Sequence, residues 1–409
     1  MSDSQTEATK PTCLKCGNNP TSHLAARFDA GMYLVLNPLV GWFLYTPLAR
    51  PLVWVLDESF LLFLYGLRLI GLAKFVPVTM ELKSDRGQVL ADEAKARGYG
   101  FEVLKMGSRL VDTYRVTFKD GRRLVFGGLP RVDRVNMVSS NWMDDKWLMK
   151  QCLMKGGVPV SRGRSVYSWR AAKAVFNSVE KPVIVKPRFG SRGRHTTTFV
   201  STLADLKVAY KSARELSWPV IVEEHLTGSV YRATCVDGEL VGILAGDPPR
   251  ITGDGVHTIK ELIDTKNTTR PERVGEVKYT EKLTAFLARQ QYTLETVLPA
   301  GLRIDLSEKI GLSYGGCSRE DTAVTHSKLQ AELARAAQVV GDPLLGFDFI
   351  APSITADPDT MKWGIIECNS VPFINLHHDP LEGTPVNAAA AVWDWIERDL
   401  HRVSLFSRL

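Results

Sequence analysis

The feature of this sequence that most constrains its fold is an apolar stretch near the N-terminus. Residues Ala30–Ala49 carry no charged side chain over roughly the length that a membrane-spanning helix needs. Pro38, Gly41 and Pro47 interrupt the run, and these residues argue against an unbroken spanning helix. A clean spanning helix is therefore not the favoured interpretation of this stretch.

The longer apolar segment 28–76 leaves three arrangements open. It can form a helical arm that packs on a core or joins two copies, a hairpin at a membrane surface, or a true span. Aromatic residues such as Trp42 and Trp54 suit a bilayer interface and a protein interface equally well. We expect a helical arm over 28–76, and a peripheral membrane contact or a homo-oligomer through it stays open.

The rest of the chain has the composition of a globular protein. With 409 residues, of which 44% are hydrophobic, it can bury substantial cores in two or three domains. The net charge of +6 is dispersed and lacks an interleaved basic and aromatic stripe, so we expect no nucleic-acid partner. The polar, partly acidic N-terminus lacks the features of a secretory signal. We therefore expect a cytoplasmic protein, with membrane association through the arm as the open alternative.

The six cysteines do not suggest a disulfide framework in a chain of this length. Cys13, Cys16 and His23 have a spacing that could ligate Zn²⁺. A closed structural zinc site needs four ligands, and no second CxxC pair or nearby cluster supplies the fourth. The expectation is therefore a polar tail with two reduced thiols, and zinc at Cys13 and Cys16 is the less favoured alternative.

Residues 77–137 have the pattern of a small α/β domain. A helical pattern from Leu90 breaks at Gly98, and the segment YRVTFKDGRRLVFGG alternates apolar and polar residues around the turn at Asp120 and Gly121. A new helix is expected to follow a Ser or Asn cap in the segment SSNWMDDKW and to stop at Gly156.

A cationic, glycine-bearing loop is the first candidate for chemistry. The buried strand Val183–Val185 leads into Lys186, and the loop KPRFGSRGRHT follows. Gly190 and Gly193 allow backbone N–H groups to approach a ligand closely, and the arginines of the loop add positive charge. Polyphosphate is the anion that such a loop suits, although a basic surface hairpin would have a similar sequence.

Two further patterns place carboxylates at strands. Glu223 and Glu224 end an apolar strand, where they could accept a hydrogen bond from an exocyclic amine such as that of adenine, or simply be solvated. Asp348 lies in the strand GFDFIAP, and Glu367 and Asn369 lie two residues apart in WGIIECNSVPF, on one face of a strand. If those strands pair, three oxygen ligands converge, and such ligands suit Mg²⁺.

Taken in order along the chain, these residues resemble the ATP-grasp superfamily. The resemblance rests on Lys146, Lys186, Glu223, Glu224, Asp348, Glu367 and Asn369. More narrowly, four stretches resemble the ATP-grasp module of cyanophycin synthetases: Asp247–Ile263, Arg289–Leu306, Gly315–His326 and His377–Asn387. The similarity runs from about Val138 to Trp395.

The resemblance implies a fold and a domain order. We expect an α/β (α+β) chain with an ATP-grasp domain over 138–400, whose ATP-binding lid covers about 150–225 and whose metal-binding core covers about 226–400. The polar tail 1–27, the arm 28–76 and the small α/β domain 77–137 would precede it.

The resemblance also implies site residues and a reaction. The metal ligands would be Asp348, Glu367 and Asn369, which would hold two Mg²⁺ ions. Arg303 would help to position an acyl phosphate, Lys186 would act in catalysis as well as binding, and His377 would stiffen the acceptor loop. The ATP-binding residues would be Lys146, Lys186, Gly190, Ser191, Arg192, Gly193, Arg194, Glu223, Glu224, His225 and Leu226.

In such ligases a carboxylate attacks the γ-phosphate of ATP, and an amine then attacks the acyl phosphate to form an amide. Cyanophycin synthetases also carry a second half that resembles Mur ligases, and this sequence ends at Leu409 without it. We therefore expect a single amide-forming ligase that acts on an amino acid, a peptide or a related small molecule. A catalytically weak ATP-binding scaffold and a phosphotransferase are the alternatives. The family's ribose-binding carboxylate is also replaced, by Val230.

Overall fold

The computed structural model describes residues 13–16, 21–44, 59, 62–63, 65–79, 81–130, 140–190, 193–307 and 311–399. The chain divides into two units, each built from two separate stretches. Unit 1 comprises Met1–Asp57 and Val135–Leu226, and unit 2 comprises Glu58–Arg134 and Thr227–Leu409.

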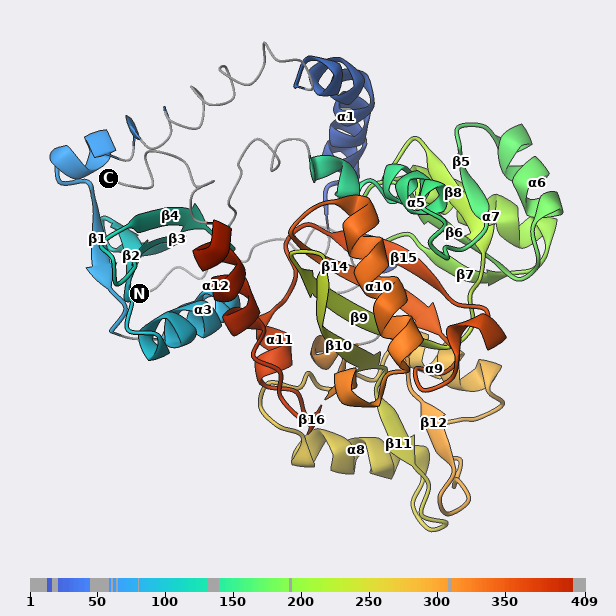
Figure 1. Ribbon diagram of the computed structural model, residues 1–409. Helices are drawn as coiled ribbons and strands as arrows, with labels where there is room; N and C mark the ends of the chain where they lie inside the picture. Colours follow the sequence, from blue (N-terminus) through green and yellow to red (C-terminus); the bar gives the residue numbers. More distant parts are fainter. Residues whose placement is uncertain are drawn as a thin grey trace, which may run out of the picture. The chain divides into compact units, whose positions relative to one another are not determined.

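Unit 1 is built on a four-stranded antiparallel sheet. In spatial order its strands are β5 (Gly163–Val166), β8 (Val220–Glu224), β6 (Val183–Pro187) and β7 (Thr197–Val200). The helices α6 (Trp169–Ser178) and α7 (Leu203–Arg214) pack on this sheet and bury their apolar faces against it (Figure 1). Ser168 and Thr202 cap these helices, because each side chain accepts a hydrogen bond from the third residue beyond it.

The helix before this sheet begins later than its sequence suggests. A 3-10 turn (Ser140–Asp144) comes first, and α5 then runs over Lys146–Lys155. The predicted Ser or Asn cap was wrong. Asp145 is the cap, and its carboxylate accepts hydrogen bonds from the backbone N–H groups of Trp147 at 2.9 Å and Leu148 at 3.3 Å. The carboxylate is already fixed there by Arg188, which the local sequence does not reveal.

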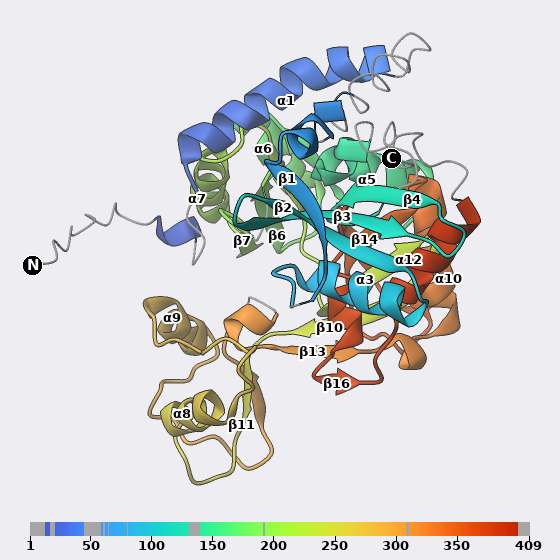
Figure 2. The same ribbon diagram turned by 90° about the vertical axis from the view of Figure 1, so that its left-hand side faces the viewer.

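A long helix, α1 (His23–Leu44), belongs to unit 1 and continues through Pro38 and Gly41. Figure 2 shows it running past α7, and Tyr33 of α1 contacts Phe189 with ring centroids 5.0 Å apart. No helix in the described part of the chain is both long enough and apolar enough to cross a membrane. Residues 45–58 of the expected arm lie outside the described residues.

Unit 2 contains a second antiparallel sheet. Its strands follow chain order: β1 (Ala73–Pro77), β2 (Gly100–Met106), β3 (Arg109–Thr117) and β4 (Arg123–Gly127). The helices α3 (Asp85–Ala96) and α12 (Ala388–Asp399) share its core, where the indole of Trp393 donates to the carbonyl of Leu90 at 3.1 Å. The helix-then-hairpin prediction for this region is confirmed. Residues 73–76, expected in the helical arm, instead form β1, because pairing with β2 buries Ala73.

The largest sheet of unit 2 has six strands. Its order is β15 (Gly364–Asn369), β14 (Leu344–Ala351), β9 (Ser229–Val236), β10 (Glu239–Asp247), β13 (Cys317–Glu320) and β16 (Glu382–Gly383). Helix α10 (Ser327–Val340) covers one face (Figure 1). Asp237 and Gly238 join β9 to β10 with positive φ angles of 51° and 79°, as a tight two-residue hairpin turn requires.

A smaller α/β substructure of unit 2 packs around its own core. The strands β11 (Arg250–Thr252) and β12 (Arg303–Asp305) pair antiparallel, and α8 (Ile259–Thr269) and α9 (Glu281–Arg289) pack against them. Further short elements are 3-10 turns at Leu14–Cys16, Leu312–Tyr314, Thr322–Val324 and Pro358–Thr360, and α11 (Asn375–His378). Residues 59, 62–63 and 65–69 are helical as well.

His377 of α11 is fully buried within unit 2. Its Nδ1 lies 2.7 Å from a carboxylate oxygen of Glu320, and its Nε2 lies 2.7 Å from the hydroxyl of Thr234. The imidazole therefore joins α11 to β13 and β9. The sequence interpretation assigned it a stiffening role in the acceptor loop, and these contacts fit a structural role.

We expect Gly242→Ala to destabilise unit 2 by about 1–3 kcal/mol. A Cβ at this position would lie 2.5 Å from Nδ1 of His377, and the imidazole is held on both sides, so it has no room to retreat. Urea unfolding would measure the loss. Gly127→Ala is the matched control, because this glycine also lies in a strand of unit 2 and a Cβ there would meet only the carbonyl of Asp112, at 3.6 Å. Equal stability of the two variants would mean that the imidazole of His377 can move aside.

Candidate functional site

The predicted site residues are divided between the two units, and each group is described by itself. Unit 1 holds the predicted ATP-binding residues, and unit 2 holds the predicted metal ligands and Arg303. Ser191 and Arg192 lie outside the described residues.

A buried glutamate flanked by two lysines is the centre of the unit 1 group. One carboxylate oxygen of Glu223, on β8, lies 2.7 Å from Nζ of Lys186, at the end of β6. The other accepts a hydrogen bond from Nζ of Lys150, on α5, which also contacts the backbone carbonyl of Ser161 at 2.9 Å and its hydroxyl at 2.5 Å. All three ionisable side chains are buried, and Lys150 is only 1% exposed.

The pKa values of Glu223 and Lys150 are shifted, because one carboxylate contacts two ammonium groups. Burial alone would raise the pKa of Glu223, but the ammonium groups of Lys150 and Lys186 outweigh it and lower this pKa to about 2. Burial lowers the pKa of Lys150, and repulsion from Lys186 acts in the same direction against the attraction of Glu223. The carboxylate of Glu224 also attracts Lys150, so two buried acids face these two lysines.

Lys150 was not identified from the sequence. It lies four residues after Lys146, so both lysines project from the same face of α5. That spacing was the available signal, but its meaning depends on Glu223, which lies 73 positions along the chain from Lys150.

The two described glycines of the cationic loop lie in the region of positive φ. Gly190 and Gly193 have φ angles of 116° and 61°, which a side chain would strain. The ammonium group of Lys146 donates a hydrogen bond to the carbonyl of Gly190, so α5 holds the start of the loop. Arg194 is half-buried and is followed by His195, which also has a positive φ, of 53°.

A second ion pair of unit 1 connects β6 to α5. Nε and Nη2 of Arg188 donate to the two carboxylate oxygens of Asp145 at 2.7 and 2.6 Å, and both side chains are buried. Asp145 thus pairs with the arginine while it caps the helix that carries Lys146. This link was not predicted from the sequence.

The end of β8 and the residues after it are tied to their neighbours: the backbone N–H groups of Glu224 and His225 donate to the carbonyls of Arg162 at 2.8 Å and Pro182 at 3.0 Å. Glu224 is buried, and its carboxylate accepts from the backbone N–H of Arg162 at 2.8 Å. The ring of His225 lies 4.3 Å from that of Phe199, and Leu226 is buried. The carboxylate of Glu223 pairs with lysines here, so its hydrogen bond with adenine stays a prediction.

In unit 2 the strands that carry the predicted metal ligands do pair. β14 and β15 are antiparallel, with Asp348 opposite Glu367 and Gly346 opposite Asn369. Arg232 of β9 donates to both carboxylate oxygens of Asp348, at 2.7 and 2.9 Å. Although burial acts to lower the pKa of Arg232, the charge of Asp348, and then that of Glu367, raise it. Arginine and the two acids therefore form one charged cluster.

These side chains fit a hard divalent cation. Asp348, Glu367 and Asn369 offer oxygen donors from paired strands, which is the donor chemistry that Mg²⁺ prefers. The amide nitrogen of Asn369 is buried without a hydrogen-bond partner, so no hydrogen bond from that atom fixes the orientation of the side chain. Each oxygen of Asp348 keeps a second acceptor position beside Arg232, so the ion pair does not exclude a metal.

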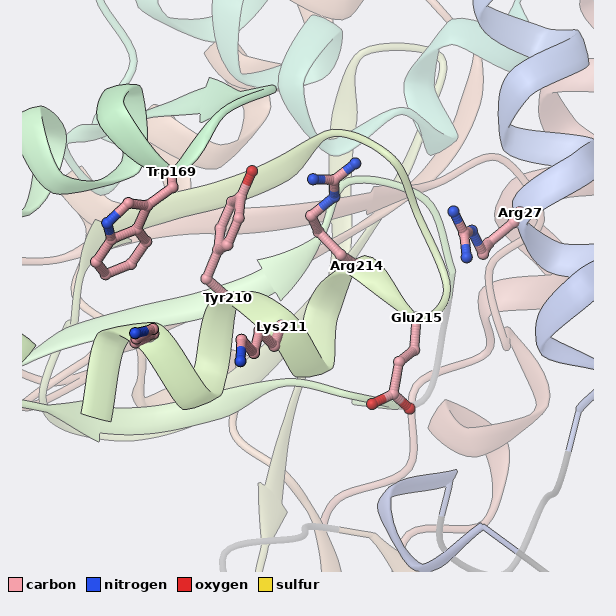
Figure 3. A pocket seen from close by; sticks show the side chains of 7 residues that line it. Arg27, Trp169, Tyr210, Lys211, Arg214 and Glu215 are labelled. Atoms are coloured by element: carbon pink, nitrogen blue, oxygen red, sulfur yellow. The ribbon is translucent and has the colours of Figure 1, made fainter. Parts of the chain in front are cut away.

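Two other features concern the remaining predicted residue and a pocket. Arg303 is exposed at the start of β12. A pocket of about 530 Å³ in unit 1 is lined by none of the predicted site residues (Figure 3). Its lining is mostly cationic and aromatic: Arg27, Trp169, Lys207, Tyr210, Lys211, Arg214 and Glu215.

Sequence comparisons find relatives that are named for the synthesis of cyanophycin and of glutathione. The chain is 32% identical to a cyanophycin synthetase from Synechocystis over 261 residues. This aligned region covers 62% of this chain and 30% of the relative. The chain is 28% identical over 327 residues to a glutathione biosynthesis bifunctional protein from Listeria innocua, which covers 78% of this chain and 41% of that relative. The chain thus spans less than half the length of either. No protein-family model matches it.

Among solved structures, a bifunctional glutathione synthetase from Pasteurella multocida superposes with a TM-score of 0.58 at 23% identity, covering 77% of this chain and 44% of that one. At this identity the likeness concerns the fold. The prediction of an α/β ATP-grasp fold is confirmed. This chain has an ATP-grasp fold and resembles the ATP-grasp region of the cyanophycin synthetases.

Proposed function

We propose that this protein uses ATP to join a carboxylate to an amine, forming an amide bond and releasing ADP and phosphate. The observation that carries the proposal is the pair Lys150 and Lys186, which share one buried carboxylate beside a glycine loop. Lys186, held there by Glu223, and the cationic side chains of the loop suit a polyphosphate. Similarity to proteins named for cyanophycin and glutathione synthesis supports amide formation as the outcome.

ATP binding would draw on three parts of unit 1. Lys146 and Lys186 would contact the phosphates as point charges, and the loop from Gly190 to Arg194, including Ser191 and Arg192, would cover them with backbone N–H groups. Lys186 would contribute to catalysis as well, because charge on the transferred phosphoryl group rises in the transition state. The backbone of Glu224, His225 and Leu226 would bind the adenine edge, with Glu223 beside it.

The reaction would proceed in two displacements. A substrate carboxylate oxygen attacks the γ-phosphorus, the bond to the β-phosphate oxygen breaks, and ADP leaves with the electron pair. The amine nitrogen then attacks the acyl carbon, phosphate leaves, and the nitrogen loses a proton. Arg303 would position the acyl phosphate. The acid and the amine would come from amino acids, peptides or related small molecules.

Asp348, Glu367 and Asn369 would hold Mg²⁺, and the family pattern corresponds to two ions. Bound there, the cations would supply charge stabilisation for the phosphate oxygens. Arg232 would keep the carboxylate of Asp348 oriented through its two hydrogen bonds.

The proposal is tested by incubating the full chain with ATP, Mg²⁺ and mixtures of amino acids, followed by mass spectrometry and ADP assay. The expected result is ADP release together with a product that is one water lighter than the summed substrates. A stable phosphorylated product would instead identify a phosphotransferase. Binding of ATP without any ADP release in every mixture would identify a scaffold.

An interaction through the arm is part of the proposal. Exposed apolar side chains on α1, such as Phe28 at 65% and Val35 at 64%, support a homo-oligomer or a peripheral membrane contact through residues 28–76. Sedimentation of the full chain with and without lipid vesicles distinguishes the two.

We expect 2′-deoxy-ATP to support turnover nearly as well as ATP, because Val230 cannot accept hydrogen bonds from the ribose hydroxyls. Val230→Glu should then lower KM for ATP by about fivefold to thirtyfold, the equivalent of about 1–2 kcal/mol, and leave KM for 2′-deoxy-ATP less changed. Steady-state kinetics with both nucleotides on both proteins measures this. A strong preference of the wild type for ATP would mean that another group already binds the ribose.

A further inference from the structure

Four side chains with the chemistry of zinc ligands meet in unit 1. They are Cys13, Cys16, His23 and His195, and their candidate ligand atoms all lie within 4.8 Å of one another. The sequence alone offers the first three as candidates, and the chain fold brings in His195, which lies directly after the glycine loop. Cys16 and His195 are both 2% exposed, so the cluster is largely shielded from solvent.

The distances match the edges of a tetrahedron around one ion. Nε2 of His195 lies 3.5 Å from the sulfur atoms of both Cys13 and Cys16, and Nε2 of His23 lies 3.3 Å from the sulfur of Cys16. Zinc bonds of about 2.0–2.1 Å to nitrogen and about 2.3 Å to sulfur place tetrahedral N and S ligands about 3.5 Å apart. These three N–S separations are therefore those expected of ligands of one ion, and all four atoms lie within 4.8 Å of one another.

Outer contacts orient both imidazoles with Nε2 toward the cluster. Nδ1 of His195 donates to the backbone carbonyl of Ser212 at 2.9 Å, which leaves Nε2 unprotonated in the neutral ring. A carboxylate oxygen of Glu215 lies 3.7 Å from Nδ1 of His23 and 3.5 Å from Nδ1 of His195. Carbonyl and carboxylate partners of this kind commonly fix metal-bound histidines.

The backbone also supports this arrangement. The N–H of Cys16 donates to the carbonyl of Cys13 at 3.0 Å, which folds the CxxC segment into a tight turn. The N–H of His195 donates to the carbonyl of Lys15 at 3.3 Å, so the turn lies directly against the end of the glycine loop. His195 has a φ of 53°, an uncommon conformation for a residue other than glycine that is found at constrained, functional positions.

We propose that Cys13, Cys16, His23 and His195 form a closed structural Zn²⁺ site. Two thiolates and two imidazoles are a ligand set of structural zinc sites, whereas Mg²⁺ requires oxygen donors. Binding would release the two thiol protons to solvent. Because the ligands come from the N-terminal turn, the first residue of α1 and the end of the glycine loop, the ion would fasten all three together.

The site also accounts for the neighbouring pocket. Arg27 lies one helical turn after His23 on α1, and Glu215, which contacts both histidines, lines the same pocket. Figure 3 shows Arg27 approaching from α1 while Tyr210, Lys211 and Arg214 come from α7. An ion that holds His23 against His195 therefore also holds α1 beside α7.

The test uses the full chain, expressed without a metal-binding tag and desalted before elemental analysis. We expect about one zinc ion per chain in the wild type, and less than about a tenth of that in Cys16→Ser and His195→Ala. Cys152→Ser is the matched control, since this thiol lies on α5 outside the cluster and its loss should leave the zinc content unchanged. Circular dichroism checks that each variant is folded.

Two further measurements separate loss of a ligand from loss of the fold. Metal-free wild type given Co²⁺ should show the visible bands of a tetrahedral ion and a thiolate-to-cobalt charge-transfer band. His195→Cys should restore zinc binding and strengthen the charge-transfer band, because it adds a third sulfur ligand. Absence of zinc and of cobalt bands in the wild type would overturn the proposal, as would an unchanged cobalt spectrum in His195→Ala. Neither outcome depends on ATP or on amide formation.

Discussion

Glu367→Gln is expected to reduce ATP-dependent product formation by at least about a hundredfold while leaving the protein folded. The substitution keeps the size of the side chain but removes one of two carboxylates opposite each other on β14 and β15. With Glu367 neutral, the cluster would retain Asp348, which Arg232 already pairs with through both oxygens. Little negative charge would then remain to attract a divalent cation.

The measurement is ADP release at several Mg²⁺ concentrations. Glu239→Gln is the control, because this carboxylate is exposed at the start of β10 in the same sheet and should leave the rate within about twofold. Partial recovery of Glu367→Gln at high Mg²⁺ would agree with a weakened metal site. A rate near that of the wild type at low Mg²⁺ would remove Glu367 from the site.

The parts of the site that sequence could predict are those encoded within a few residues. The strand before Lys186 and the turn at Gly190 follow from a short apolar run and glycine spacing, and the structure has both. Glu367 and Asn369 share a face because side chains in a strand alternate, and only the pairing with Asp348 required the fold.

The parts that sequence could not predict depend on partners far apart in the chain. His195 lies 182 positions from Cys13, so a scan for metal ligands near the CxxC segment finds three and stops. The cap of α5 is a similar case. Several residues that could cap a helix precede Lys146. The residue that does so, Asp145, is also paired with Arg188, which lies 43 positions away in the chain.

The prediction that 73–76 are helical failed for a related reason. The segment continues an apolar run, and it is too short for the spacing of its apolar residues to distinguish a helix from a strand. Its outcome depends on β2, which offers an unpaired edge to Ala73 and the residues after it. Tertiary pairing therefore decided the local structure.

Glu223→Gln is expected to lower the free energy of unfolding of unit 1 by about 3–5 kcal/mol. Glutamine can fill the same space, but Lys150 and Lys186 would then face each other without the carboxylate that contacts both of them. Urea unfolding followed by tryptophan fluorescence would measure the loss, and Glu180→Gln, an exposed carboxylate of the same unit, is the control. Adding Lys150→Met to Glu223→Gln should restore part of the stability, because one buried cation is removed.

The pH dependence of the free energy of unfolding gives an independent check that the charge of Glu223 stabilises unit 1. Glu223 has a folded-state pKa of about 2, below the value of about 4.3 in an unfolded chain, so its stabilising contribution is complete above about pH 4.3 and is lost as the pH falls toward 2. The stability difference between wild type and Glu223→Gln should therefore be constant near neutral pH and shrink below about pH 4.3. A difference that persists unchanged down to pH 2 would mean that the loss comes from packing. An absent difference at neutral pH would mean that the two lysines do not depend on the charge of Glu223.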